Sequence, residues 1–237
     1  MDNEVLVQGL YKISGSTTVS GCTNDENGSL NLTGELNMDE QEGTDYWGYG
    51  SVIDTTYGGY YDFSVEGSVD SAGKLAGIYS SYDQTGTFTG TVTGNRLQMS
   101  LVGSVPEDTC RFSTSLSGTL YAPATNGFAP GYLGDTSTRI DVLSGSGVFP
   151  ASGSYQINFL SDGGFEFFPL PAMTPVTDGL SLYTKTGANT GTILMYELNG
   201  YITYSTALNF TSPTNGTFSN RSIGLPGTQS GRFTVLP

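Results

Sequence analysis

The stretch TGTFTGTVTGNRLQMSLVG, residues 85–103, places threonine at every second position before a glycine–asparagine pair at 94–95. Successive side chains of a β-strand point to opposite faces, so the threonines face one way while Phe88 and Val92 face the other. Glycine followed by asparagine is typical of a two-residue hairpin turn, which would pair Val92 with Leu97. The stretch therefore predicts a hairpin with one packed face and one wetted face.

The packed face of this hairpin reads Gly86, Phe88, Gly90 and Val92, which alternates small and large side chains. Such alternation is expected where a sheet coils tightly and its inner face tapers, as inside a small barrel. The threonines are then an outer wall. The alternative is a flat binding ladder of the ice-binding type, which would require the pattern to be stacked at a fixed repeat, and the chain has no such repeat.

The same alternation recurs before residue 121, at 30–38, 63–69 and 110–120. Turn-rich segments separate these runs, so eight or nine short strands are expected in this half. In the second half, hairpins are predicted within 153–168 and 192–210, and no segment of the chain has helical spacing of apolar residues. The fold class predicted is all-β, with two tandem antiparallel meander β-barrels or barrel-like sandwiches.

The segment YAPATNGFAPGYLG, residues 121–134, has two prolines and no alternation, and is interpreted as a connector. The predicted domains are an N-terminal β-barrel with a disulfide at 1–121, a proline-containing connector at 122–134 and a C-terminal β-barrel at 135–237. A meander must pair or hide its edge strands, and closure into a barrel does so.

Acidic residues outnumber basic ones by 22 to 8, which gives a net charge of -14 and an isoelectric point near 4.1. A nucleic acid or an anionic lipid surface would be repelled, so neither is an expected partner. No apolar run approaches the roughly 18 residues of a membrane helix, and the outward polar face is the inverse of a membrane barrel. The opening MDNEVLVQG has neither the basic start nor the apolar run of a signal peptide.

Cys22 and Cys110 are the only cysteines, 88 positions apart in the first half of the chain. Each lies beside an expected strand end, which favours a disulfide over two buried thiols. A disulfide implies an oxidising compartment, so an extracellular, cell-surface or periplasmic location is expected.

Two stretches carry a resemblance to a known class of barrel. LYTKTGANTGTILMYELNGYITYSTALNFTSPTNGTFSN (182–220) and FTGTVTGNRLQMSLVG (88–103) with its flanking cysteines are similar to calycin-like barrels of the lipocalin, avidin and MoaF-like type in exported bacterial proteins. The resemblance implies small-molecule binding inside a barrel or a role at the cell surface. It transfers no catalytic residue.

The chain contains no histidine, which removes Ser-His-Asp and Cys-His nucleophile systems and the commonest metal ligand. Phosphate-binding glycine motifs are absent as well, so no cofactor is predicted. Paired carboxylates remain for a glycosidase, with Asp45, Asp54, Asp62 and Glu66 as candidates. The ordinary interpretation is that these are surface acids, and no catalytic residue is predicted.

Two acidic loops, NDENG (24–28) and MDEQEGTD (38–45), concentrate the oxygen ligands that calcium prefers. The first lacks the later glutamate of an EF-hand loop, because Gly34 occupies that place. Both are interpreted as solvated turns, and no metal site is predicted.

The densest aromatic region is DYWGYGSVIDTTYGGYYDF, residues 45–63, which contains the only tryptophan. Aromatic faces stack on sugar rings and other flat ligands, and nearby carboxylates and phenols form hydrogen bonds. The alternative is that half of these rings fill the barrel and the rest lie on an exposed strand pair. The ligand-binding residues predicted here are Asp45, Tyr46, Trp47, Tyr49, Tyr57, Tyr60 and Tyr61.

The predicted function is that of an exported, non-catalytic binding or cell-surface protein, with a carbohydrate or a small apolar molecule as its ligand. The first alternative is a structural subunit of a surface assembly or an adhesin that associates through an edge strand or the connector. The second is a carboxylate-dependent glycan-active enzyme.

Overall fold

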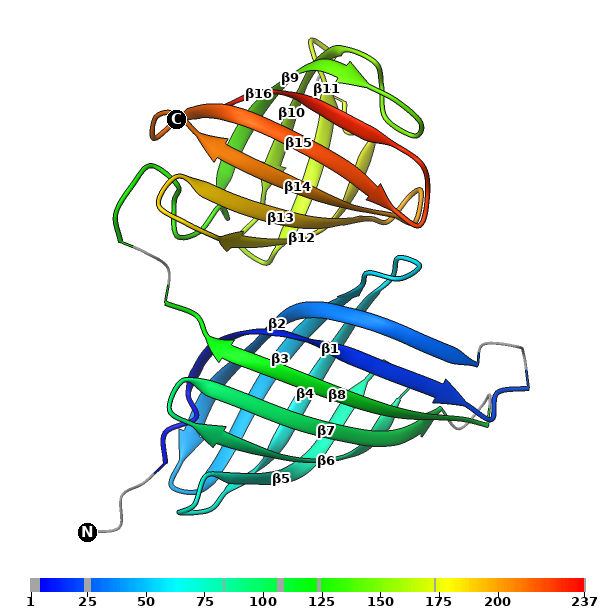
Figure 1. Cartoon of the computed structure of the whole chain (residues 1–237), viewed down its shortest axis with the longest axis vertical. Coiled ribbons are helices and arrows are strands. Elements are labelled where there is room, and N and C mark those ends of the chain that lie inside the picture. Colours follow the sequence, from blue (N-terminus) through cyan, green and yellow to red (C-terminus); the bar gives the residue numbers. More distant parts are fainter. Residues whose placement is uncertain are drawn as a thin grey trace. The chain divides into compact units, whose positions relative to one another are not determined.

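The computed structural model of the chain describes residues 5–23, 27–82, 84–105, 109–122, 125–172 and 174–236. Within these ranges the chain forms sixteen β-strands and no helix, and the strands close into two antiparallel barrels of eight (Figure 1). The all-β prediction of two tandem meander barrels is confirmed. Because the described residues form no helix, none is long and apolar enough to cross a membrane.

The first barrel follows the chain without a crossover, and its last strand pairs antiparallel with its first. Its strands are β1 (Gly9–Ser20), β2 (Gly28–Glu42), β3 (Asp45–Asp54), β4 (Tyr60–Val69), β5 (Lys74–Ser81), β6 (Thr85–Thr93), β7 (Arg96–Val105) and β8 (Cys110–Leu120).

The second barrel repeats this topology, with the last strand again closing on the first. Its strands are β9 (Thr136–Gly145), β10 (Gly153–Phe159), β11 (Gly164–Pro169), β12 (Thr177–Lys185), β13 (Thr190–Glu197), β14 (Ile202–Phe210), β15 (Asn215–Ile223) and β16 (Thr228–Leu236).

The β6–β7 hairpin has the predicted register, with Val92 opposite Leu97 across the turn. The five threonines of β6 are exposed, whereas Phe88, Val92 and Leu97 are buried in the core of the first barrel. The first turn residue, Gly94, has a φ of 59°, which two-residue hairpin turns require and which glycine adopts without strain. The threonine row is therefore an outer wall.

The small residues on the inner face of β6 allow close packing of neighbouring strands. A Cβ atom at Gly90 would lie 2.3 Å from the backbone carbonyl oxygen of Gln98 on β7. No side chain fits at that distance, so glycine at this position lets the sheet coil tightly, as the alternation of small and large residues predicts.

A disulfide joins Cys22, just after β1, to Cys110 at the start of β8, with a Cα–Cα distance of 4.3 Å. These two strands are the ones that close the first barrel. The disulfide prediction is confirmed, and the bond fastens the seam at which the first and last strands of the barrel meet.

The chain divides into two compact units whose main boundary lies between Tyr121 and Ala122, with residues 57–59 grouped in the second unit. The segment interpreted as a connector packs against the second barrel over its later part. Ala129 and Leu133 belong to the core of that barrel, and the Ala129 N–H donates to the carbonyl oxygen of Ala188 in the β12–β13 turn. This part of the connector is therefore an end cap of the second barrel.

Both sheets are closed, so every one of the sixteen described strands has a partner on each side. An edge strand is the element that adds to the sheet of a neighbouring molecule. In the described part of either barrel, no strand has a free edge through which the protein could associate with a neighbouring molecule.

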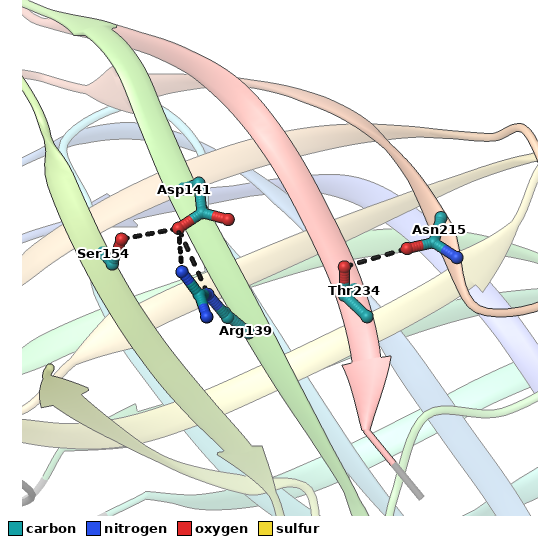
Figure 2. Close-up of polar contacts among 5 residues, drawn as sticks. All are labelled: Arg139, Asp141, Ser154, Asn215 and Thr234. Carbon is teal, nitrogen blue, oxygen red and sulfur yellow. Dashed lines mark hydrogen bonds and ion pairs between the residues drawn. The ribbon is translucent and has the colours of Figure 1, made fainter. Parts of the chain in front are cut away.

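Polar contacts connect neighbouring strands on the outer wall of the second barrel (Figure 2). The Asp141 carboxylate on β9 accepts hydrogen bonds from the Ser154 hydroxyl on β10 and from the Arg139 guanidinium. The Ser154 hydrogen bond is the largest cause that holds the pKa of Asp141 below its ordinary value. Burial opposes this lowering, and the hydrogen bond and charge of Arg139 add smaller lowering effects. Nearby, the Thr234 hydroxyl donates to the Asn215 side-chain oxygen at 2.9 Å.

Candidate functional site

The second barrel encloses a cavity of about 320 Å³. Its wall consists mainly of hydrocarbon and aromatic side chains that the strand alternation directs inward. On β14, for example, Ile202, Tyr204, Thr206, Leu208 and Phe210 all line the cavity. This volume lies in the range of small-molecule binding sites, which are concave, mostly apolar and carry a few polar groups.

One end of the cavity is closed by the cap that precedes β9. Leu133 lines the cavity at this end. The Tyr183 hydroxyl on β12 donates to the carbonyl oxygen of Pro130 at 2.9 Å, and the Lys185 ammonium donates to that of Asn126 at 3.0 Å. Hydrogen bonds from inward-facing side chains of the barrel therefore hold the cap in place.

At the other end the cavity extends to the turns that join the strands. Val148, Phe149 and Pro150 from the β9–β10 turn line it, together with Val176 before β12. The Phe149 ring packs edge-on against Tyr204, with the ring centroids 5.8 Å apart. The cavity of the second barrel is thus closed by the cap at one end and bordered by turn residues, which form its rim, at the other.

A row of three polar side chains crosses the inner wall on adjacent strands. Thr206 on β14 lies opposite Asn220 on β15, which lies opposite Gln229 on β16. All three line the cavity and are buried, with exposed fractions of 5%, 8% and 7%. We call Thr206, Asn220 and Gln229 the polar row.

Hydrogen bonding within the polar row is incomplete. The Thr206 hydroxyl donates to the Asn220 side-chain oxygen at 3.2 Å. Among the described residues, neither the NH₂ group of Asn220 nor the side-chain amide of Gln229 has a hydrogen-bond partner. Buried polar groups are nearly always paired, so these amides favour a polar group in the cavity.

The hydroxyl of Thr138 on β9 is also buried in the cavity wall and has no partner among the described residues. An unpaired buried hydroxyl costs free energy because its interaction with water is lost. Without a hydrogen-bond partner, the buried Thr138 hydroxyl therefore lowers the stability of the folded protein.

The charge around the cavity is negative. Glu197, at the end of β13 near the rim, lines the cavity and is half-buried. Burial, followed by the negative charge of Glu197, raises the pKa of Tyr204 well above its ordinary value. None of the eight lysine and arginine side chains lines the cavity, and Lys185 at the cap is bonded to a carbonyl oxygen.

The predicted aromatic site is divided between two faces of the first barrel. Tyr46 points inward, is buried in the core, and its hydroxyl has no partner among the described residues. Its neighbours Asp45 and Trp47 point outward, as does Tyr49, and the two rings are 43% and 44% exposed. Strand alternation therefore separates residues that are adjacent in sequence.

The other predicted residues lie at or beyond the ends of the strands. Tyr57 is exposed in the β3–β4 turn, Tyr61 is exposed near the start of β4, and Tyr60 is half-buried on its outer face. The Tyr60 hydroxyl donates to Ser51 and Asp62. The seven predicted residues do not converge on one site.

An open groove on the outer wall of the first barrel contains Trp47. The groove is also lined by Glu40, Glu42, Asp45 and Glu66. Trp47 lies directly between Glu40 on β2 and Glu66 on β4 in the strand register. This outer-wall groove combines an exposed aromatic ring with hydrogen-bond acceptors.

Two of the four candidate glycosidase acids have clear structural partners. Asp54 is buried and accepts a hydrogen bond from the Thr56 N–H at 2.7 Å, which stabilises the turn after β3. Asp62 accepts from Ser51 at 2.7 Å and from Tyr60. Burial and the Asp62 carboxylate together raise the pKa of Tyr49 to about 12. These contacts give both carboxylates ordinary roles as acceptors.

The two acidic loops considered for calcium differ in how far they are described. Residues 24–26 of the first loop lie outside the described residues. The second loop runs from the end of β2 into β3. In the described ranges no group of three or more histidine, cysteine or acidic side chains is placed to hold a metal ion.

Sequence reasoning placed no candidate residue in the second half of the chain. The signal available there was the polar row, because its members occupy inward positions among apolar ones. Asn220, for example, follows Phe218 with the same parity on β15. A polar residue at an inward position of a barrel strand is a sign of either a buried hydrogen bond or a ligand contact.

No family model matches the chain, and no curated protein matches it. Among solved structures it is similar to the crystal structure of a protein with unknown function from the DUF3598 family of Nostoc punctiforme PCC 73102. The two chains are 9% identical with a TM-score of 0.27, over 97% of this chain and 95% of the other. At that similarity only the chain's own side chains bear on its function.

Proposed function

We propose that the protein is a non-catalytic binding protein whose second barrel holds a small, mainly apolar molecule. The observation that carries this proposal is the cavity of about 320 Å³, capped at one end and walled by inward-facing apolar side chains. Burial of apolar ligand surface in such a cavity contributes about 25 cal/mol per Å². The disulfide supports an oxidising location, extracellular, at the cell surface or periplasmic.

Titration with the uncharged dye N-phenyl-1-naphthylamine, whose emission rises in apolar surroundings, tests this proposal. We expect a saturable rise in dye fluorescence with one dye bound per chain. Leu208→Trp places a larger side chain in the cavity and is expected to abolish the rise. The control is Ala207→Trp, which adds the same ring to the exposed face of the same strand. A wild-type titration without saturable binding would contradict the proposal.

A second candidate function is carbohydrate binding in the outer-wall groove of the first barrel. Trp47 is exposed there between two carboxylate-bearing positions, an arrangement that suits stacking on a sugar ring and hydrogen bonding to its hydroxyls. Trp47 is the only tryptophan, so its fluorescence reports on this groove alone. Oligosaccharides that bind are expected to change the emission in the wild type and much less in Glu66→Gln; emission unchanged across a broad panel would exclude this function.

A further inference from the structure

We propose that the cavity of the second barrel selects an uncharged ligand that carries a hydroxyl or carbonyl group, and that it discriminates against carboxylates; this inference rests on the proposed function. The polar row and the charge around the cavity provide two independent supports.

The first support is the hydrogen-bonding capacity left open in the polar row. Gln229 offers one acceptor oxygen and an NH₂ group, and Asn220 offers its own NH₂ group because its oxygen already accepts from Thr206. A ligand hydroxyl accepts from an NH₂ group and donates to the Gln229 oxygen, and a carbonyl accepts from either NH₂ group. Both residues are more than nine-tenths buried.

The second support is the absence of positive charge along the described cavity wall. A carboxylate moved into an apolar cavity is stable only beside a cation or several donors. The lining has no lysine or arginine, and its one charged group, Glu197 at the rim, repels an anion. In the same barrel Arg139, Arg221 and Arg232 are exposed. Lys185 is buried beneath the cap, does not line the cavity and donates to the carbonyl oxygen of Asn126.

The apolar wall and the polar row together define the ligand chemistry. The wall accommodates hydrocarbon, and the row accommodates one uncharged polar group within it. A fatty alcohol, a ketone or a hydroxylated ring system has this composition. A fatty acid of equal length has the same hydrocarbon, but at about pH 8 its carboxylate carries a negative charge that the cavity disfavours.

Competition against bound N-phenyl-1-naphthylamine tests the inference with 1-decanol and decanoate, which share one chain length. At about pH 8 we expect decanol to displace the dye at a concentration at least about tenfold lower than decanoate. Equal or tighter binding of decanoate would overturn the inference while leaving the proposed function intact. Absence of dye binding to the wild type would instead remove the proposed function and the inference together.

The role of the polar row is tested with Gln229→Met, which keeps the length of the side chain and removes its hydrogen bonds. We expect this variant to bind decanol about 3-fold to 10-fold more weakly than the wild type does, because that factor corresponds to the loss of about one hydrogen bond. Saturable dye binding by the variant shows that the cavity still forms. The control Gln98→Met makes the same change on the exposed outer wall of the first barrel and is expected to alter neither affinity.

Unchanged decanol affinity in Gln229→Met would overturn the assignment of the polar row. If that variant does not fold, the comparison of decanol with decanoate on the wild type still decides the inference, because it depends on no substitution.

Discussion

The Tyr183 hydroxyl, inside the second barrel, donates a hydrogen bond to the backbone carbonyl oxygen of Pro130, which lies 53 positions earlier in the chain. This bond joins a barrel strand to the segment that caps the barrel. The hydrogen bond therefore stabilises the packing of the cap on the second barrel. The closed end of the cavity depends on this cap.

Tyr183→Phe removes this hydrogen bond and keeps the ring. We expect a loss of about 1 kcal/mol of unfolding free energy, because the Pro130 carbonyl oxygen loses its partner. The measurement is the midpoint of urea unfolding followed by circular dichroism. Tyr82→Phe, at a fully exposed ring in the first barrel, is the control and is expected to leave the midpoint unchanged. Equal midpoints for wild type and Tyr183→Phe would show that the bond does not stabilise the cap.

Thr138→Val and Thr206→Val make the same chemical change in the wall of one cavity. We expect them to have opposite effects on the free energy of unfolding. Thr138 has an unpaired buried hydroxyl, so its removal is expected to stabilise the ligand-free protein by up to about 1 kcal/mol. Thr206 donates to Asn220, so its removal is expected to destabilise by about 1 kcal/mol. Urea unfolding of both variants measures the difference, and a shift of the same sign in both would contradict the assigned hydrogen bonds.

Cys22→Ala together with Cys110→Ala removes the disulfide that fastens the first barrel. The bond spans 88 positions, and cross-linking so long a loop stabilises a fold by about 4 kcal/mol in the chain-entropy account. We expect a loss of that order in urea unfolding followed by Trp47 fluorescence, since Trp47 lies in this barrel. Reduction of the wild type with dithiothreitol provides an independent control and is expected to give the same shift. A midpoint unaffected by either treatment would contradict this role.

Ser154→Ala is expected to raise the pKa of Asp141 toward its ordinary value of 3.8, because the Ser154 hydrogen bond is the largest cause of its lowering. A carboxyl group with a lowered folded pKa stabilises the fold above its unfolded pKa and loses that effect as the pH falls through the folded pKa. The wild type should therefore exceed Ser154→Ala in stability above about pH 5, and the difference should shrink on acidification.

Carbon-13 NMR titration of the Asp141 carboxyl group measures its pKa directly. Thr234→Val removes the separate Thr234–Asn215 hydrogen bond shown in Figure 2 and serves as the control. It is expected to leave the Asp141 titration in place. A Ser154→Ala titration that coincides with that of the wild type would show that the hydroxyl does not set this pKa.

The fold was predictable because its main signal is local. The inward positions of β6 and β7 follow from a period of two, and the glycine–asparagine turn fixes the register that places Val92 opposite Leu97. Both cysteines were predicted to lie at strand ends, and the fold brings these ends together at the barrel seam. Each of these features depends on neighbours in sequence or on simple closure of a meander.

The candidate site was not predictable in the same way. The density of aromatic residues at 45–63 drew attention to the first barrel, but the alternation of β3 sends Tyr46 into the core and Trp47 to the outer wall. A high density of aromatic residues in the sequence therefore did not mean that their side chains meet at one site.

Which side chains face the inside of each barrel can be read from the amino-acid order alone, because the direction of a side chain depends on its parity along one strand. The folded barrel is needed to show that the inward side chains of the second barrel leave a cavity, and that Asn220 and Gln229 lie beside each other in its wall. The volume left inside a closed sheet depends on how side chains from eight strands and the cap fill it together, and no single strand contains that information.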